Sequence, residues 1–404
     1  MKILVISQQY WPENWRIVDI CEELVKEGNS VTVICGLPNY GTGIILPEYE
    51  KGKNRKQVHN GVQIIRCYEH GRGKGPVNLF INYQSFKNSS CRYVRKMNDE
   101  FDVVILNGLS PIVQSKAGIL YCQKFHKKCL MYCMDLWPIS LSVGKITNHG
   151  IAKPIYDHYL KVSKRIYSSC DYIFVSSEPF ISYFSNVLFV KKDKLEYLPQ
   201  YSEDVFLASE HQEIEHKTLH NFVFAGNVGK AQDIKTIIKA ASLISRADIS
   251  IHIYGDGSEL ANSKKMAADL SLTNIVFHGR VSMETMAKIY KNADAMLLTL
   301  VDSELSNLVV PGKVQTYMAA GKPIICAAGR ASSDIIREAN CGICVSPGDP
   351  IGLSKAIIKL ASLNKDELAE YGERSFLYSK EHFSRSGFFA RLSSKLNELT
   401  QQNK

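Results

Sequence analysis

Short β-branched segments alternate with amphipathic helical segments along this chain, and the alternation occurs twice. This pattern is typical of parallel sheets with helices on both faces, because a parallel strand returns to its sheet through a crossover. In the first half we expect strands near residues 3–7, 31–35, 62–67, 103–106, 129–133 and 172–175. In the second half we expect them near 222–225, 249–254, 275–277, 295–300, 323–326 and 343–345. The predicted fold class is α/β, with two doubly wound, Rossmann-like domains facing each other across a cleft.

The predicted domain boundary lies in a polar, acid-rich segment without periodicity, residues 199–217. We therefore expect an N-terminal domain at 1–199, a linker at 200–218 and a C-terminal domain at 219–380. The last segment, 381–404, is predicted to be a helix that packs back on the N-terminal domain. It carries an apolar stripe at helical spacing, which consists of Phe388, Phe389, Leu392, Leu396 and Leu399.

Composition excludes several classes of protein. A chain of 404 residues with 45% hydrophobic and 22% charged residues is long and apolar enough for two or three folded domains. It lacks the run of about 18 apolar residues that a membrane-spanning helix needs, and its first residues suggest a strand and not a signal peptide. We therefore expect a cytoplasmic protein. Its 11 cysteines are expected to be reduced, and Cys341 and Cys344 suggest a turn and not a zinc site.

Positive charge is concentrated in the first half. Residues 1–200 hold 26 Lys and Arg against 17 Asp and Glu, whereas residues 201–404 hold 23 of each. Between Lys51 and Lys96 there are eleven basic residues and one acid, Glu69. Such a cluster indicates an anionic partner: nucleic acid, an acidic bilayer surface or a phosphorylated substrate. Nucleic acid is disfavoured, because no stacking platform or recognition motif accompanies the charge.

Ligands of doubly wound sheets bind at the carboxyl ends of the strands, so functional residues are expected in the strand-to-helix turns. The clearest is Gly226-Asn-Val-Gly229, where glycines let backbone N–H groups approach an anion. Alone, this turn fits an ordinary tight turn equally well. Similar turns follow at Gly255 and at Gly279-Arg280-Val281, and three turns on one sheet edge favour a phosphate-bearing ligand.

The most informative segment is residues 309–325, in which Pro311 precedes an expected helix and Gly321-Lys-Pro follows it. Proline presets the first helical turn, so Lys313 is predicted near the helix start. A cation there is unfavourable by about 0.3 to 1 kcal/mol unless an anion binds beside it. The alternative is a solvated lysine.

Together, these motifs resemble glycosyltransferase family 4, the retaining GT-B enzymes that use nucleotide sugars. The resemblance rests on FVFAGNVGKAQ at 222–232, YGDG at 254–257, FHGRV at 277–281 and PGK at 311–313 with YMAAGKP at 317–323. In the first half WPENWRI at 11–17, GLPNYGTG at 36–43 and MDLWP at 134–138 resemble the branch of L-fucosamine transferase-like enzymes, which build bacterial surface polysaccharides.

The resemblance implies a donor site that would hold the diphosphate, the base and the sugar of a nucleotide sugar. Its implied residues are Gly226, Asn227, Gly229, Gln232, Gly255, Arg280, Val281, Lys313 and Thr316. Two departures stand out. Leu308 and Thr316 occupy the two acid positions of the family's Glu-x7-Glu signature, and Asn227 and Gln232 replace the Arg and Lys of its first donor turn. The cationic role then falls to Arg280 and Lys313, with Gln315 or Glu304 as candidates to assist Thr316 at the ribose.

The resemblance also implies that Asp135, Lys313 and Arg280 act in catalysis. Acceptor-binding residues would be Arg16, Asn39, Tyr40, Asp135 and Trp137. A helix-capping role for Asp135 and a surface ion pair for Arg16 are the alternatives. No Asp-x-Asp motif occurs, so we expect neither a metal nor another cofactor.

Residues 79–97 combine an apolar stripe with basic residues, namely Lys87, Arg92, Arg95 and Lys96. This pattern is typical of a helix that lies on an anionic bilayer, but the stripe fits the domain core equally well.

The predicted function is the transfer of a sugar from a nucleotide donor to a polyprenyl-diphosphate-linked saccharide. The expected donor is a UDP-linked N-acetylated or deoxy amino sugar. This reaction belongs to the synthesis of lipopolysaccharide O-antigen or capsule. It would take place at the cytoplasmic face of the inner membrane, with a peripherally bound enzyme. A sugar-nucleotide 2-epimerase of similar architecture and a non-catalytic partner in a polysaccharide-assembly complex are the alternatives.

Overall fold

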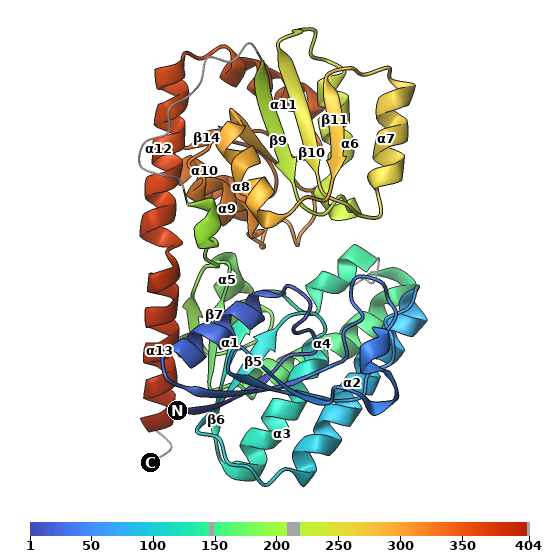
Figure 1. Ribbon diagram of the computed structural model, residues 1–404, viewed down its shortest axis with the longest axis vertical. Coiled ribbons are helices and arrows are strands. Elements are labelled where there is room, and N and C mark those ends of the chain that lie inside the picture. The colour runs from blue at the N-terminus through green and yellow to red at the C-terminus, as the bar shows by residue number, and fades with distance from the viewer. Residues whose placement is uncertain (145–148, 208–218, 402–404) are drawn as a thin grey trace. The chain divides into compact units, whose positions relative to one another are not determined.

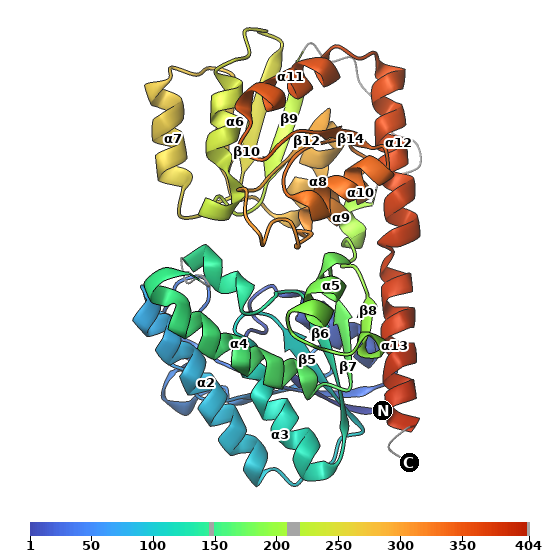
Figure 2. The same ribbon diagram turned by 180° about the vertical axis from the view of Figure 1, so that it is seen from behind.

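The computed structural model describes residues 1–144, 149–207 and 219–401, and the chain divides into two compact units (Figures 1 and 2). Unit 1 consists of Met1–Ser176, Phe180–Leu198 and Ala390–Lys404, and unit 2 of Ser177–Pro179 and Pro199–Phe389. Most of the expected linker, residues 208–218, lies outside the described residues. Each unit is a doubly wound α/β domain, which confirms the predicted fold class.

Unit 1 is built on an eight-stranded sheet with the order β3-β4-β2-β1-β5-β6-β7-β8, in which only β3 is antiparallel to its neighbour. Its strands are β1 (Lys2–Ile6), β2 (Ser30–Cys35), β3 (Lys56–His59), β4 (Val62–Arg66), β5 (Val103–Gly108), β6 (Lys128–Cys133), β7 (Tyr172–Val175) and β8 (Leu195–Tyr197). Its helices are α1 (Arg16–Lys26), α2 (Pro76–Lys96), α3 (Lys116–Phe125), α4 (Lys153–Ser168) and α5 (Pro179–Asn186).

The inner strands of unit 1 are apolar on both faces because helices cover both. Ile3, Leu4, Val5 and Ile6 of β1 are fully buried, and β1 pairs in parallel with β2 and β5. The two strands that sequence analysis did not predict, β3 and β8, are short and lie at the edges of the sheet. Edge strands need no long apolar run, so they leave a weak signal in the sequence.

Unit 2 has a six-stranded, entirely parallel sheet with the order β11-β10-β9-β12-β13-β14. Its strands are β9 (His220–Ala225), β10 (Ile249–Tyr254), β11 (Ile275–Gly279), β12 (Ala295–Thr299), β13 (Ile324–Ala327) and β14 (Gly342–Cys344). Its helices are α6 (Ile234–Ala241), α7 (Leu260–Asp269), α8 (Met283–Asn292), α9 (Lys313–Ala319), α10 (Arg330–Glu338), α11 (Pro350–Ala361) and α12 (Lys365–His382). Buried aliphatic and aromatic residues form one core on each face of this sheet.

The last helix, α13 (Arg385–Gln401), belongs to unit 1 from Ala390 onward. Its apolar stripe is at most 4% exposed, as expected for a packing face. On the polar side, the guanidinium of Arg391 donates to the carboxylate of Glu196, and Ser393 Oγ donates to Glu27 Oε2 at 2.6 Å. Among the described helices, none combines the length and apolarity needed to cross a bilayer.

The order of the strands fixes where each unit can bind a ligand. In unit 2 the chain runs outward from β9 through β10 and β11 and then returns to the other side of β9 with β12. Unit 1 makes the same reversal between β1 and β5. Loops that leave neighbouring strands in opposite directions open a crevice at the carboxyl ends of those strands.

Candidate substrate sites

The donor turns of unit 2 approach each other as closely as glycine allows. Gly226, directly after β9, has φ 130°, and Gly255, directly after β10, has φ 132°. A Cβ atom on Gly255 would lie 1.8 Å from the carbonyl oxygen of Gly226. The next turn is as tight, because a Cβ on Gly257 would lie 2.5 Å from the backbone oxygen of Val228. These glycines therefore allow backbone to pack on backbone at the sheet edge.

Backbone donors remain available in the first of these turns. Val228 N donates to Asp256 O at 2.9 Å, which holds the turn against its neighbour. In the described part of the chain, the N–H groups of Asn227 and Gly229 have no hydrogen-bond partner. Unused N–H groups beside glycines are suited to an anion.

Lys313 lies over the first donor turn. It is the first residue of α9, as predicted, and its Nζ donates to Gln232 Oε1 at 2.8 Å. The same ammonium lies 3.8 Å from the ring centroid of Phe224. A Cβ on Gly226 would lie 2.6 Å from Lys313 Cε, so only glycine leaves room for this side chain. Lys313 and Gln232, 81 residues apart in the sequence, thus meet at the switch point.

The ammonium of Lys313 has no acidic partner among the described residues, and burial lowers its pKa to about 7. A cation removed from water without a counter-charge is unfavourable, and its pKa falls for that reason. An approaching anion would remove this penalty. The geometry is therefore that of an anion-binding group.

Two further contacts hold the site in place. Tyr317 Oη accepts from Ala225 N at 3.0 Å and donates to Ala225 O at 3.1 Å, which fixes α9 to the end of β9. The loops that leave β9 and β12 are tied together because Val301 N donates to Ala231 O at 3.0 Å. Sequence analysis gave no role to Tyr317. Its position one turn beyond Lys313 in an apolar helix was the only available signal.

The residues proposed for the ribose differ in exposure. Thr316 is half-buried and its hydroxyl donates to Gly312 O at 3.0 Å, and Leu308 is half-buried too. Gln315 is fully buried, with its amide within 3.3 Å of the carbonyl oxygens of Pro311 and Gly312. It is thus turned toward its own helix start, so the expectation that Gln315 assists at the ribose is wrong. Glu304 is exposed.

Arg280 and Val281 follow the end of β11, on the same edge as the other donor turns. Arg280 is exposed and Val281 is half-buried. No ion pair involves Arg280 in the residues that the structure covers. Its side chain therefore keeps its charge available for a ligand.

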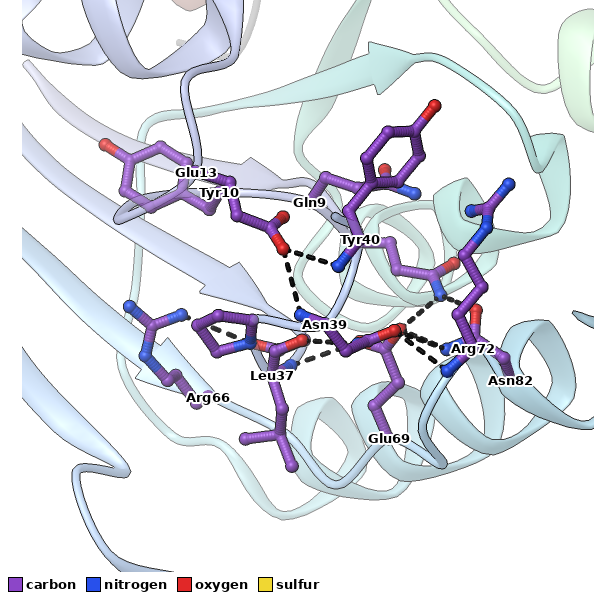
Figure 3. Close-up of a pocket in the computed structure, with 13 residues that line it drawn as sticks. Gln9, Tyr10, Glu13, Leu37, Asn39, Tyr40, Arg66, Glu69, Arg72 and Asn82 are labelled. Carbon is purple, nitrogen blue, oxygen red and sulfur yellow. Dashed lines mark hydrogen bonds between the residues drawn. The ribbon is translucent and has the colours of Figure 1, made fainter. Parts of the chain in front are cut away.

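The corresponding edge of unit 1 holds a narrow polar pocket around Glu69 (Figure 3). This carboxylate is 3% exposed and accepts four hydrogen bonds. Their donors are Gln8 Nε2 at 2.8 Å, Asn39 Nδ2 at 3.1 Å, Asn82 Nδ2 at 2.6 Å and Leu37 N at 3.1 Å. Glu69 thereby joins the loops after β1 and β2 to helix α2. Burial raises the pKa of Glu69 to about 7 against the opposing effect of these donors.

Aromatic and basic side chains border this pocket. The ring of Tyr40 is half exposed, packs edge to face on Trp15 with 4.7 Å between ring centroids, and lies 4.7 Å from the guanidinium of Arg72. Glu13 Oε1 accepts from the backbone N–H groups of Asn39 and Tyr40, which fixes this loop. Figure 3 shows Tyr40 and Arg72 on the same side of the pocket.

Two carbonyl acceptors in the pocket are unused. Gln8 and Gln9 are at most 7% exposed, and the Oε1 atom of each has no partner in the described residues. Buried acceptors of this kind are normally satisfied, by water or by a ligand that carries donors. Neither glutamine was predicted as a site residue, although both directly follow the first strand.

The residues predicted to bind the acceptor have different surroundings. Asn39 is buried with both side-chain polar atoms engaged, since Oδ1 accepts from Arg72 N at 2.9 Å, so it holds the pocket together. Asp135 is half-buried and its Oδ2 accepts from Ser110 N at 3.2 Å. Arg16, the first residue of α1, is half-buried as well.

Trp137 is 2% exposed, donates through Nε1 to Ser110 Oγ at 2.6 Å and packs on Tyr159. These contacts give it a packing role, and its role in acceptor binding stays a prediction.

Glu69 and Arg72 also line this pocket and, like Gln8 and Gln9, were not predicted as site residues. Glu69 had one signal, because it is the only acid in the basic run from Lys51 to Lys96. An isolated acid among eleven cations is more readily explained by a buried network than by a surface role.

The structure of helix α2 shows where the apolar stripe of residues 79–97 lies, either in the domain core or on the surface. Four members of the stripe are at most 8% exposed, namely Tyr83, Phe86, Val94 and Met97, so this part belongs to the domain core. Phe80 is 53% exposed. Arg92, Arg95 and Lys96 are exposed and Lys87 is half-buried, which leaves the basic face of the helix outward.

Two doubly wound units, each with helices on both faces of a mostly parallel sheet, are typical of the GT-B fold, and solved structures agree. Sucrose-phosphate synthase from Thermosynechococcus elongatus aligns over 99% of both chains with a TM-score of 0.76 at 16% identity. The Anabaena protein Alr3699/HepE, solved in complex with UDP-glucose, aligns over 98% of this chain and 100% of its own with a TM-score of 0.70 at 11% identity.

Sequence comparisons support the glycosyltransferase class. Residues 208–375 match the family model of glycosyl transferases group 1. The probable glycosyltransferase WbjE of Pseudomonas aeruginosa is 31% identical over 149 residues, 36% of this chain and 37% of that protein. WcaI of Escherichia coli, named for colanic acid biosynthesis, is 27% identical over 158 residues, 38% of this chain and 39% of that protein. The chain thus matches less than half the length of each of these relatives. The comparisons thus show the GT-B fold along the chain and a match to group 1 glycosyl transferases over residues 208–375.

Proposed function

We propose that this protein is a retaining glycosyltransferase that moves a sugar from a UDP-linked donor to a polyprenyl-diphosphate-linked saccharide. The donor sugar is an N-acetylated or deoxy amino sugar, and the product is a bacterial surface polysaccharide such as O-antigen or capsule. The observation that carries this proposal is the buried ammonium of Lys313, without an acidic partner, at the switch point of unit 2.

In the proposed reaction, the bond between the sugar and the diphosphate breaks and negative charge grows on the departing nucleoside diphosphate. Lys313 and the free N–H groups of Asn227 and Gly229 lie where they can bind that charge. Arg280 is proposed to add a second cation from the turn after β11. Donors that are already in position stabilise a transition state most effectively, because little reorganisation is needed as charge develops.

These cations account for the charge of the diphosphate without a divalent ion, so we propose that catalysis needs no metal. On the same proposal, Gly226 and Gly255 bring the backbone close to the diphosphate, Val281 borders the base and Thr316 contacts the ribose. UDP as the nucleotide is supported by the UDP-glucose complex of the structurally similar Anabaena protein.

Unit 1 is proposed to bind the acceptor at its polar pocket. The ring of Tyr40 gives an apolar surface for a sugar ring, and the unused Oε1 atoms of Gln8 and Gln9 can accept hydrogen bonds from sugar hydroxyls. Arg72 supplies positive charge for a diphosphate. Asp135 follows β6 and Arg16 begins the helix after β1, so both lie at the same edge of the sheet, and they are proposed to orient the acceptor. The lipid-linked acceptor and the basic face of α2 suggest an enzyme that is peripherally bound at the cytoplasmic face of the inner membrane.

The test is an assay of nucleotide release with a panel of UDP-sugars, a lipid-linked saccharide acceptor and membrane vesicles. We expect acceptor-dependent release with at least one donor and a loss of turnover by two or more orders of magnitude in Lys313→Ala. The matched control is Lys230→Ala, which removes an exposed cation from the same donor loop and should retain most of the turnover. The proposal is contradicted if none of the UDP-sugars releases nucleotide. It is also contradicted if epimerised nucleotide forms without acceptor.

A further inference from the structure

A groove runs along one face of unit 1 where helices α2 and α4 flank the start of α3. Figure 2 shows these three helices together on one side of the unit 1 sheet. The groove has a volume of about 490 Å³. Its floor is apolar and is formed by Val113, Ile119, Leu120, Val162 and Ile166.

The rim of this groove is basic. Lys87 and Arg95 come from α2, Lys116 from α3, and Arg165 from α4, with His158 as a further titratable group. No carboxylate lines the groove, and these four cations form no ion pair in the described part of the chain. An adjoining hollow of about 260 Å³ is lined by Lys87, Arg92, Arg95 and Lys116 and also contains no acid.

The cations of this rim are held close to one another. The pKa of Lys87 is lowered by burial and then by the charge of Lys116. Its Nζ finds only the neutral acceptor Gln84 Oε1 on the same helix. Cations that repel one another above an apolar floor are unfavourable in the free protein, and an anion with an apolar extension would remove both penalties.

We infer that this groove binds an anionic phospholipid of a membrane surface, with the phosphate between Lys87, Lys116 and Arg165 and an acyl chain along the apolar floor. A phosphate alone would match the rim but leave the floor exposed to water. A nucleic acid would match the charge but has no aliphatic chain for this floor. Only an amphiphile complements both parts.

Exposed apolar side chains on the same two helices favour a membrane partner. Val77, Phe80 and Ile81, near the start of α2, are 69%, 53% and 42% exposed. Ile155, near the start of α4, is 49% exposed. Because most of the apolar stripe of α2 is in the domain core, the helix cannot lie flat on a bilayer. Contact is made instead through these side chains and the groove. This inference rests on the membrane association proposed above, to which it assigns a groove and a class of lipid, and it does not depend on the transfer reaction itself.

The experiment is co-sedimentation of the full chain with vesicles of neutral phosphatidylcholine, with and without anionic phosphatidylglycerol. We expect binding only to the anionic vesicles. Each cation near the surface contributes about 1 kcal/mol, so Lys87→Gln with Lys116→Gln should weaken partitioning about 30-fold. The matched control is Lys264→Gln with Lys265→Gln on α7, which removes the same charge from exposed positions in unit 2. This control should bind like the wild type.

A second variant distinguishes the groove from a diffuse basic surface. Val162→Phe fills the apolar floor and leaves every cation in place, so it should weaken binding to anionic vesicles severalfold. Thermal shifts with a UDP-sugar should stay at the wild-type value in all of these variants, which separates loss of lipid binding from failure of the donor site or of folding.

Three results overturn the inference. In the first, the α7 control loses as much vesicle binding as the groove variant. In the second, Val162→Phe binds vesicles as tightly as the wild type. In the third, inorganic phosphate or single-stranded RNA stabilises the chain through Lys87 and Lys116 while anionic vesicles do not bind.

Discussion

Affinity for a UDP-sugar should fall as the pH rises above neutrality, because the diphosphate needs a charged Lys313. Burial lowers the pKa of this ammonium to about 7, whereas a solvated lysine has a pKa of about 10.4. Below pH 7 the free protein already carries the charge. Above pH 7 the ammonium is mostly neutral, and donor binding must be accompanied by uptake of a proton.

The size of the effect follows from linkage. The bound diphosphate raises the pKa of Lys313, so between the free and bound pKa values each pH unit costs about tenfold in affinity. From pH 7, where the ammonium is half charged, to about pH 8.5 the dissociation constant should therefore rise about 15-fold. A UDP-sugar is a suitable probe, because its diphosphate diester does not titrate in this range.

Isothermal titration calorimetry at several pH values, in two buffers of different ionisation enthalpy, measures both the affinity and the protons taken up. We expect uptake to approach one proton at the upper end of the range. Lys313→Arg stays charged and should bind with an affinity independent of pH, although its fork cannot reproduce the lysine geometry. Lys313→Met should bind weakly at every pH. Lys230→Met should keep the wild-type slope.

A wild-type affinity that is constant across this range, without proton uptake, would refute the role assigned to Lys313. The same holds if the slope persists in Lys313→Met, since another group would then be titrating.

Three further predictions concern the framework of the two sites. The pKa of Glu69 is raised to about 7, so between about pH 4.5 and pH 7 the folded state binds more protons than the unfolded state, and stability falls as the pH rises. Urea unfolding at pH 5 and pH 8 measures this decline in the free energy of unfolding, and Glu69→Gln should make it smaller by roughly 3 kcal/mol. An equal decline in the wild type and the variant would contradict the prediction. Gly255→Ala should abolish donor binding and lower the unfolding midpoint, because its Cβ would meet Gly226 O at 1.8 Å; a crystal structure with an unshifted donor turn would disprove this. Tyr317→Phe should cost about 1 kcal/mol of stability and weaken UDP-sugar binding, since two hydrogen bonds fix α9 to β9; unchanged affinity would show that α9 is held by packing alone.

Periodicity was sufficient to predict the layers and most strands, because strands buried on both faces must be apolar throughout. Tyr172–Val175 and Ile249–Tyr254 have the predicted bounds. The edge strands Lys56–His59 and Leu195–Tyr197 were missed because neither needs an apolar run.

The three glycine turns at the ends of β9, β10 and β11 were predictable because each follows an apolar strand, and their role at a donor site stays a prediction. The contact between Gln232 and Lys313 was not predictable, since it depends on the strand order that makes β9 and β12 neighbours.

The proposed acceptor pocket was less accessible to sequence reasoning, because its central group is a carboxylate held by neutral amides. Gln8, Asn39 and Asn82 come from three separate loops or helices, and no spacing in the sequence relates them to Glu69. Asn39 was predicted through a motif and is present in the pocket, but its side chain is already engaged. A motif thus located the pocket without revealing which of its residues are free to bind a ligand.

Lys313 and Glu69 are both ionisable, both removed from water and both without an ion-pair partner in the described residues, yet their surroundings favour different roles. Glu69 has four donors in place, so its charge is satisfied within the protein and its function is to hold three segments together. Lys313 can donate three hydrogen bonds and is given one acceptor and the face of a phenyl ring. Since a buried charge is costly unless it is paired, the group with unused capacity is the one that a ligand completes. Saturation of its hydrogen bonds therefore favours a positioning role for Glu69, and the two unused donors of Lys313 favour its proposed role in binding the diphosphate.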